Sequence, residues 1–534
     1  MPSLVNIPKN FTAYFGPPGT GKTTTLSHLV CHYAEEEGSD SLLLTSFTKA
    51  AAQELAGRDL ALTPGSIGTL HSHCYRALDH PTIAESKAKD WNIAFPHYPM
   101  SVSHASSVQD SASAGKQSLP DEHDTRQQDL LGDTLLAALN YARSSLRPVP
   151  AGDGALGLFV RHWCDWKAQY GYLDFTDLLE QGVKLLRVAP GNPRTLIVDE
   201  AQDLTPLQWK LVAQWSQHTT RTIAGGDDDQ CLYQWCAADP TPLLAAPSTS
   251  KHVLPKSYRL PIAIYDYAQQ YLNAIETREP KTWSSNGLPG LQTHATYSWE
   301  RPSTMLPLIE ATLSVGWETC MVLAPCGYML DPLVRFLRAE GIPFGNPWRR
   351  RRGDWNPLHY GGRGMSSVAR LRDFLRPRAR LWTWAELASW GVMLRQRGNM
   401  LPGATTLLTL HGDETTVCSL DMLTQIFTPA ALQGALQGGL QWLEGCLLKR
   451  FAAAMAFPLR VYKRYGRAAL AADPRIIVGT CHSVKGGEAD RVILFTELSR
   501  MFQQARALGG DAADSVERML YVGATRAREE LYVV

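Results

Sequence analysis

Short apolar runs alternate along the chain with longer stretches that have a helical pattern. The first run, 11–15, is followed by a glycine-rich turn and a helical pattern through Tyr33, and the second, 42–45, precedes a helical pattern from about Thr48. This order of strand, loop, helix and strand is typical of a parallel α/β sheet. Because the runs form two clusters, the pattern predicts two α/β cores. Later runs that fit strands occupy 195–198, 221–224, 319–324, 476–479, 492–496 and 531–534.

Two long stretches interrupt these cores. The first, 79–155, has a middle part (101–128) rich in Ser, Ala, Gln and Asp, which predicts a flexible segment without a packed core. The second, 346–473, contains helical leucine and alanine patterns, several tryptophans and four consecutive arginines after Trp348. We therefore predict mainly helical insertions, and we expect the second to contact duplex nucleic acid. The predicted first core comprises 1–78 and 156–260, and the second comprises 261–345 and 474–534.

Composition narrows the class of protein only slightly. The 534 residues, 44% of them hydrophobic and 19% charged, allow about three or four structural units of ordinary globular type. The net charge of +1 does not indicate a nucleic-acid binder, so any basic surface must be local. The arginine run at 349–352 could be a solvated loop or a phosphate contact. The ten cysteines lack paired CxxC spacing, and no signal peptide or membrane-spanning run is evident, so we expect a cytoplasmic protein.

The segment after the first apolar run fits the phosphate-loop pattern G-x-x-x-x-G-K-[ST]. Its glycines let backbone N–H groups approach phosphate oxygens, and the following helix adds its positive N-terminal end. Lys22 would reach the β- and γ-phosphates, and the Thr23 hydroxyl would ligate Mg²⁺. The residues predicted to hold ATP through its phosphates are Gly16, Pro17, Pro18, Gly19, Thr20, Gly21, Lys22, Thr23 and Thr24.

A pair of acids supplies the second half of such a site. The apolar run 195–198 ends in Asp199, which would hold Mg²⁺, and Glu200, which would orient or deprotonate the attacking water. Acids at strand ends are common, but a pair that follows a phosphate loop is a second, independent signal. The two signals together predict a nucleoside triphosphatase.

Nine segments along the chain carry the next signal, namely 46–55, 68–74, 174–179, 199–208, 225–235, 254–259, 321–344, 479–488 and 517–527. In this order they resemble the motifs of the UvrD/Rep/PcrA group of superfamily-one helicases. The resemblance implies two RecA-like parallel-sheet cores, with ATP and Mg²⁺ as cofactors. It also implies 3′-to-5′ translocation on single-stranded DNA, with unwinding at junctions between single and double strands. It names no protein partner.

The resemblance also assigns roles at the nucleotide. Gln230 would sense the γ-phosphate, and Arg259 and Arg526 match the family's two γ-phosphate arginines. Both arginines are expected to lie on the second half of the chain and to reach ATP only when the cores close, which would link hydrolysis to movement. Tyr258 would stack on the adenine, and Glu488 would contact the ribose.

Contacts with the DNA strand are implied in the same way. Phe47, Tyr233 and Trp235 match positions where aromatic faces stack on bases, although each could instead belong to the core. His71 and His482 are expected near the DNA backbone.

The chain departs from the family's pattern at several positions. The family's glutamine before the phosphate loop has no counterpart, since the first glutamine is Gln53, and this leaves the base specificity open. Cys236 stands where relatives usually carry arginine, and Gly487 and Ala489 replace a leucine and an aromatic residue. The alternatives are a single-strand translocase that does not unwind, an ATP-gated nucleic-acid-binding protein, and an RNA substrate.

Overall fold

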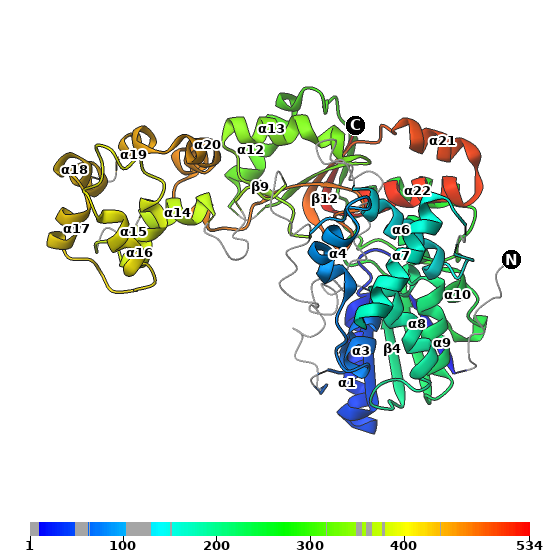
Figure 1. Cartoon of the computed structure of the whole chain (residues 1–534). Helices are drawn as coiled ribbons and strands as arrows, with labels where there is room; N and C mark the ends of the chain where they lie inside the picture. The colour runs from blue at the N-terminus through cyan, green and yellow to red at the C-terminus, as the bar shows by residue number, and fades with distance from the viewer. Residues whose placement is uncertain are drawn as a thin grey trace. The chain divides into compact units, whose positions relative to one another are not determined.

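The computed structural model describes residues 10–47, 62–63, 65–102, 130–149, 152–316, 318–348, 355–358, 366–375, 380–437 and 439–534. The chain divides into two compact units. Figure 1 shows its helices and strands, coloured from the N-terminus to the C-terminus. Unit 1 comprises 1–293, 325–327 and 496–531, and unit 2 comprises 294–324, 328–495 and 532–534.

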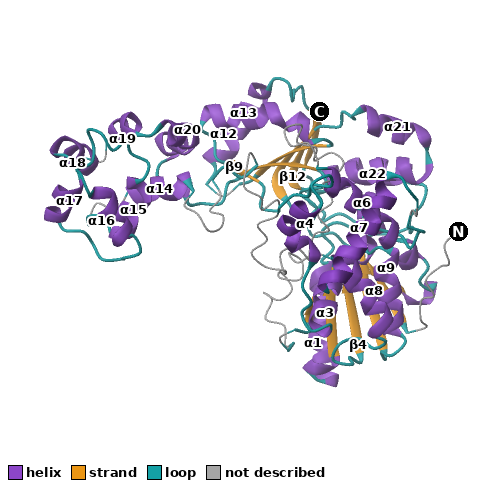
Figure 2. Cartoon of the chain, viewed as in Figure 1, coloured by secondary structure: helices purple, strands orange, loops and turns teal. Residues whose placement is uncertain are grey.

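The sheet of unit 1 has the strand order β3-β2-β4-β5-β1-β6, and each neighbouring pair is parallel. In Figure 2 its strands lie among helices. Parallel pairing brings the carboxyl ends of β1, β4 and β5 to one edge, where ligands bind in open α/β sheets. The strands are β1 (Phe11–Phe15), β2 (Leu42–Ser46), β3 (Ile67–Gly68), β4 (Thr195–Asp199), β5 (Arg221–Gly226) and β6 (Lys251–Val253).

Alternate residues of these strands pack against helices on opposite faces of the sheet. Leu196 and Val198 share a buried cluster with residues of α3, α8 and α9, whereas Ile197 between them packs with Leu26 and Val30 of α1. This follows from the period of two along a strand. The described helices of unit 1 are α1 (Lys22–Glu37), α3 (Leu70–Ala77), α4 (Ala88–Ala94), α6 (Leu131–Ser144), α7 (Ala155–Tyr170), α8 (Phe175–Leu185), α9 (Pro206–Ser216), α10 (Thr241–Leu244), α11 (Ile262–Ala274), α21 (Arg500–Leu508) and α22 (Gly510–Ala524).

The first insertion has an aromatic core of its own. Trp91 of α4 contacts Phe159, Trp163 and Trp166 of α7, and leucines of α6 complete the cluster. The insertion thus includes α7, which the sequence placed in the first core. The predicted flexible segment lies outside the described residues except for 101–102.

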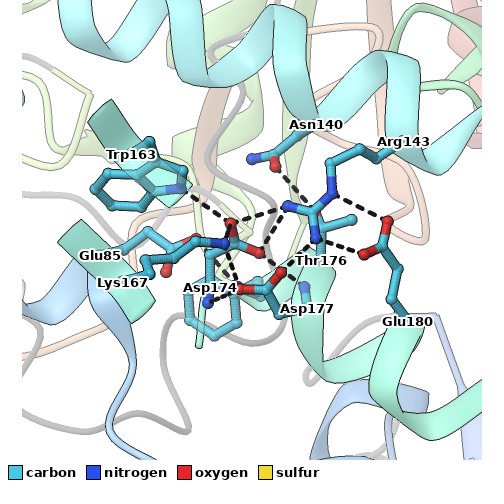
Figure 3. A network of polar contacts seen from close by, with 10 residues as sticks. Glu85, Asn140, Arg143, Trp163, Lys167, Asp174, Thr176, Asp177 and Glu180 are labelled. Carbon is cyan, nitrogen blue, oxygen red and sulfur yellow. Dashed lines mark hydrogen bonds and ion pairs between the residues drawn. The ribbon is translucent and has the colours of Figure 1, made fainter. Parts of the chain in front are cut away.

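A buried charge network joins this insertion to α8 (Figure 3). Asp174, fully buried, caps α8 and accepts bonds from Arg143 of α6 at 2.9 Å and Lys167 of α7 at 2.5 Å. Burial alone would raise the pKa of Asp174, but the two cations lower it to about 2. Arg143 also pairs with Asp177 and Glu180 of α8. Three helices therefore share one set of charges.

The second sheet has the order β7-β12-β11-β8-β10-β9, in which β8 pairs with β10 and β11, and β10 with β9, all in parallel. The strands are β7 (Leu291–His294), β8 (Cys320–Ala324), β9 (Phe344–Gly345), β10 (Ile476–Thr480), β11 (Ala489–Leu494) and β12 (Ala527–Val533). Both sheets confirm the predicted α/β class with two RecA-like cores.

The described part of the second insertion is helical, as predicted. Its short helices and the two that precede it belong to unit 2. These helices are α12 (Leu306–Ser314), α13 (Asp331–Glu340), α14 (Ser367–Phe374), α15 (Trp384–Gly391), α16 (Ala404–Leu410), α17 (Leu420–Ile426), α18 (Pro429–Leu436), α19 (Leu440–Cys446) and α20 (Lys449–Tyr465).

The units divide the chain differently from the predicted cores. Residues 261–293 and 496–531, expected in the second core, belong to unit 1. The reason is a set of bonds between α22 and the end of α11: Asp514 accepts the N–H groups of Glu276 (2.8 Å) and Thr277 (2.9 Å). Arg518 donates to the Thr277 carbonyl at 2.5 Å.

No helix in the described ranges has both the length and the apolar composition that a membrane crossing needs. The ten cysteines are all free thiols.

Candidate functional site

The phosphate loop lies between β1 and α1, at the carboxyl edge of the first sheet. The Gly16 N–H donates to the Gly226 carbonyl at the end of β5 (2.9 Å), and the Thr20 hydroxyl donates to the Pro17 carbonyl (2.8 Å). Gly21, at φ +77°, directly precedes α1, which begins at Lys22. The turn therefore places Lys22 and the half-buried Thr23 in the first turn of a helix, where anions are stabilised.

A second segment clamps this loop from the side. The Ser257 hydroxyl donates to the Pro18 carbonyl (2.7 Å), and the Tyr258 N–H donates to the Gly19 carbonyl (2.8 Å). A Cβ added at Gly19, whose φ is +72°, would lie 2.3 Å from the Cβ of Arg259. Glycine is therefore required at residue 19, and the clamp places Arg259 beside the phosphate loop. The Tyr258 side chain is 74% exposed, as a stacking platform requires.

The two acids lie at the end of β4, as predicted. Asp199 is 1% exposed, and its Oδ1 accepts the Glu200 N–H at 2.9 Å. Glu200 Oε1 lies 2.7 Å from Lys22 Nζ, and its Oε2 accepts Gln202 Nε2 at 2.5 Å. Burial would lower the pKa of Lys22, but Glu200 and Asp199 outweigh it and raise this pKa above its ordinary value. Lys22 is thus a charged group held toward the acids.

These residues fit a nucleoside triphosphate with magnesium. A hydroxyl and a carboxylate, from Thr23 and Asp199, are the oxygen donors that Mg²⁺ prefers, and Asp199 is buried at the edge where the phosphate loop begins. The backbone N–H groups of the loop and Lys22 provide the positive field for phosphates.

Gln230 and Arg526 meet in unit 1. Gln230 ends the short 3₁₀ turn η4 (Asp228–Gln230), and its Oε1 accepts Arg526 Nη2 at 3.1 Å. Arg526 is 1% exposed and also donates to the Val522 carbonyl at 2.8 Å. Arg259 and Arg526 therefore belong to the same unit as the phosphate loop. Arg526 lies in the range predicted for the second core, whereas Arg259 lies in the range predicted for the first. The α22 bonds described above account for Arg526.

Three predicted DNA-contact aromatics lie next to one another. The rings of Phe47 and Tyr233 stack at 5.6 Å between centroids, and Trp235 follows Tyr233 at 6.5 Å with its ring tilted by 62°. All three are half-buried, so the structure brings them together as a row that keeps part of each ring accessible. The Trp235 Nε1 is buried and has no hydrogen-bond partner within the described residues.

The two predicted histidines are neutral at physiological pH. Burial lowers the pKa of His71, whose ring lies edge-on to Phe175, to about 4. Burial, together with Lys485, lowers the pKa of His482 in unit 2 to about 4 as well. Any contact of these side chains with DNA would therefore be through hydrogen bonds and not through charge.

Unit 2 also carries Glu488, which is exposed, and the unusual Gly487 beside it. A Cβ at Gly487 would lie 2.3 Å from the indole ring of Trp348. The Trp348 ring thus occupies the space that a leucine side chain at residue 487 would need. The arginines 349–352 lie outside the described residues.

Sequence reasoning missed several residues that support the site. Ser257 bonds to the phosphate loop, and Gln202 bonds to Glu200. Lys281 and Arg278 form ion pairs with the aspartates that precede Gln230. The three consecutive aspartates 227–229 carried a usable signal, because buried carboxylates require a buried cation.

A phosphate loop after the first strand and an acid pair at the end of β4, in a parallel sheet, define a phosphate-loop nucleoside triphosphatase. The family model for the UvrD/REP helicase N-terminal domain matches residues 5–251, and that for the UvrD-like helicase C-terminal domain matches residues 475–534. The chain belongs to the UvrD/Rep helicase family.

Several curated proteins are similar to part of the chain. The ATP-dependent DNA helicase PcrA of Bacillus subtilis is 26% identical over 295 residues, which cover 50% of this chain and 38% of PcrA. The ATP-dependent DNA helicase srs2 of Schizosaccharomyces pombe is 24% identical over 325 residues, covering 54% of this chain and 36% of srs2. The ATP-dependent DNA helicase UvrD2 of Mycobacterium tuberculosis is 25% identical over 288 residues, which cover 49% of this chain and 41% of UvrD2. The chain spans less than half the length of these relatives.

Proposed function

We propose that this protein is an ATP-dependent DNA helicase that moves 3′ to 5′ on single-stranded DNA and unwinds duplex. One observation carries the proposal: the segment 227–235 contains Gln230, which bonds to Arg526, and, five residues later, Trp235 of the aromatic row. Because only five residues separate Gln230 from Trp235, we expect a change in the contacts of Gln230 to shift the residues that would hold a base.

The hydrolytic roles follow from the chemistry of the site. Lys22, Thr23 and Asp199 would hold the Mg²⁺-bound triphosphate of ATP, whose γ-phosphate is the group transferred to water. Binding requires Lys22 to exchange the Glu200 carboxylate for phosphate oxygens, since both are anionic partners of one ammonium. The exchange leaves Glu200 available to orient water.

The two arginines would stabilise the negative charge of the transition state. Arg259, beside the phosphate loop, and Arg526, bonded to Gln230, would stabilise negative charge that spreads over the transferred phosphoryl group. Tyr258 would stack on the base, and Glu488 would contact the ribose.

Stacking and backbone contacts suit single-stranded DNA of any sequence. Phe47, Tyr233 and Trp235 would each take a base on the exposed part of the ring. His71 and His482, both neutral, would bond to the DNA backbone.

The second insertion would contact the duplex. Residues 346–473 carry 18 Lys and Arg against 8 Asp and Glu, whereas the rest of the chain carries 34 against 43. Four exposed cations follow Leu394 and Leu447 within three residues, on the two segments that this pair bridges. Phosphate binding requires such a local excess of positive charge. The four cations are Arg395, Arg397, Lys449 and Arg450.

Unwinding of tailed duplexes tests the proposal. We expect ATP-dependent strand separation with a 3′ single-stranded tail and none with a 5′ tail or with blunt ends. Separation from the 5′ tail alone would contradict the polarity. DNA-stimulated hydrolysis without strand separation would favour a translocase. The same assay with each of the four nucleoside triphosphates measures base specificity, and an RNA-tailed substrate tests sugar preference.

The variant Trp235→Ala separates the strand contact from the nucleotide site. We expect weaker single-strand binding, by about 1–3 kcal/mol per lost stack, with an unchanged dissociation constant for ATP. Trp215→Phe is a control, because Trp215 is a buried tryptophan that donates to the Leu186 carbonyl and is not a member of the row. Equal loss of both kinds of binding in Trp235→Ala would show that Trp235 is a core residue.

A further inference from the structure

Three consecutive carboxylates are buried beside the nucleotide site. Asp227, Asp228 and Asp229, which connect β5 to Gln230, are each 0% exposed. Carboxylates removed from water are stable only with cations and hydrogen-bond donors at close range, and a missing partner costs several kcal/mol. The partners of these three acids therefore decide the local structure.

Lys281 is the cation at the centre of this cluster. Its fully buried Nζ lies 3.2 Å from Asp227 Oδ1 and 2.8 Å from Asp229 Oδ2, and it also bonds to Asp228 Oδ1. The three carboxylates raise the pKa of Lys281 against the effect of burial, so it stays charged. Lys281 thus occupies the place that a metal ion would take among three such acids.

The three acids differ in their other partners. Arg278 pairs with both oxygens of Asp229 at 2.8 Å, and the Glu279 N–H donates to Asp228 Oδ2 at 2.8 Å. Asp227 instead accepts Gln230 Nε2 on its Oδ2 at 2.7 Å. Asp227 is therefore the acid that joins Lys281 to the predicted γ-phosphate sensor.

The bonds of Gln230 fix which way its amide points. A carboxylate only accepts hydrogen bonds and a guanidinium only donates them. The amide NH₂ must therefore face Asp227, and the amide oxygen must face Arg526, 3.1 Å from its Nη2. A continuous chain of bonds runs from Lys281 through Asp227 and Gln230 to Arg526.

We propose that Lys281 is a positioning residue for hydrolysis: it holds Asp227, which orients the Gln230 amide and, through it, the Arg526 guanidinium. The proposal rests on the proposed ATP hydrolysis. The competing role is charge balance alone, in which any arrangement with the same local charge would serve.

A charge-matched double variant separates the two roles. Lys281→Met with Asp228→Asn removes one cation and one anion, so the net charge of the cluster is unchanged, but Asp227 Oδ1 loses its partner. We expect kcat for DNA-stimulated ATP hydrolysis to fall by roughly 100-fold, as for a displaced catalytic group, while KM for ATP stays within about threefold. A folded double variant with the kcat of the parent chain would overturn the proposal.

Lys251→Met is the matched control. Lys251, like Lys281, lies over the ring of Phe15, and it pairs with Glu279 at 2.5 Å. The same substitution there leaves Asp227 untouched, so kcat should remain within about twofold of the parent value.

A coupling measurement tests whether Lys281 acts through Gln230. In a Gln230→Ala background, the double substitution should lower kcat by less than about twofold further, because coupled residues are not additive. Losses that multiply would show that Lys281 acts by another route.

Asp227→Asn covers the case in which the double variant does not fold. This substitution relieves buried negative charge, but it replaces one of the two carboxylate oxygens by an NH₂ group. That group would face a donor, either Lys281 or Gln230, which now bond to different oxygens of Asp227. We expect the same fall in kcat with KM unchanged, and parent-like kcat would refute the proposal. The parent chain is assayed first: a parent without ATPase activity refutes the proposed function, whereas a loss in these variants alone does not.

Discussion

The backbone of Glu200 lies in the left-handed region at φ +54°, where residues other than glycine are uncommon. Such strain costs on the order of 1–3 kcal/mol and persists where the surroundings impose it. Here the ion pair with Lys22 and the bond from Gln202 hold the side chain. The strained backbone is thus accompanied by an ion pair between the Glu200 carboxylate and Lys22, the lysine that we propose binds phosphate.

Glu200→Gln should separate nucleotide binding from hydrolysis. The amide cannot compete for Lys22 as a charge, so ATP should bind at least as tightly, while turnover falls by about 100-fold or more. Lys22→Ala should instead weaken both. Steady-state ATPase assays and nucleotide titration measure these effects, with strand binding by fluorescence anisotropy expected to be unchanged.

Glu35→Gln, at an exposed glutamate of α1, serves as the control for this pair. Wild-type turnover in either Lys22→Ala or Glu200→Gln would refute the assignment of the site.

At this scale the sequence predicts residues that act through local spacing. Lys22 and Thr23 follow from the loop pattern, and Asp199 follows from its place at a strand end. Lys281 could not be assigned, because its partners at 227–229 come from a distant segment and no local pattern joins the two. The positions of Arg259 and Arg526 in unit 1 likewise depend on tertiary bonds.

Elements are predictable to the extent that they bury apolar side chains. The central strands β1, β4 and β10 begin where the apolar runs predict, since every strand of a parallel sheet core is buried on both faces. The edge strands β6 and β7 were not predicted, because their residues are half-buried or exposed and leave no apolar run. Their place is set by pairing with neighbours.

The network of Figure 3 makes the junction between the first insertion and α8 sensitive to pH. Glu85 accepts the Phe175 N–H at 3.1 Å, and its Oε2 is buried without a partner in the described structure. Burial, followed by the charge of Asp174, raises the pKa of Glu85 to about 8, against the opposing effect of Lys167. Glu85 is thus protonated in the folded chain at neutral pH.

Stability should therefore fall as pH rises from 6 to 8. Over this range the unfolded chain has already released the proton of Glu85, whereas the folded chain retains it until about pH 8. The free energy of unfolding should then decrease by up to about 1.4 kcal/mol per pH unit and level off above the folded pKa. Asp174, with a folded pKa of about 2, adds no slope in this window.

Glu85→Gln should abolish most of this slope, as measured from thermal unfolding midpoints at pH 6, 7, 8 and 9. The exposed Asp165 of α7 provides a control, because Asp165→Asn should leave the slope intact. A slope that is equal in the parent chain and in Glu85→Gln would contradict the assignment.

For the whole molecule, the sequence predicts two cores with insertions but not the division into units. Residues 261–293 and 496–531 join unit 1 through buried polar groups such as Asp514, which is 0% exposed. The spacing of apolar residues does not show which donors a buried carboxylate will bond to. The boundaries of the two units could therefore not be predicted from the sequence.

Charge is segregated along the chain, and this predicts how duplex binding depends on salt. Replacing the four exposed cations Arg395, Arg397, Lys449 and Arg450 by glutamine should reduce the slope of log K against log salt by up to about 0.9 for each lost phosphate contact. Binding to a blunt duplex, titrated between about 50 and 300 mM salt (roughly a sixfold change in the square of the screening length), measures the slope.

The control neutralises four exposed cations of unit 1, namely Lys89, Lys184, Arg187 and Lys210. An equal reduction of the slope by both sets would show that the second insertion has no particular role in holding the duplex.

The same segregation affects how copies of the protein behave in solution. With a net charge of only +1, long-range repulsion between molecules is weak near neutral pH, while residues 346–473 of one molecule and the acidic remainder of another attract. At low ionic strength this attraction between molecules favours reversible self-association, which makes the solution turbid. Added salt should screen the attraction and make the solution clear again. The solubility of this protein at low ionic strength therefore depends on the uneven distribution of its arginines along the sequence.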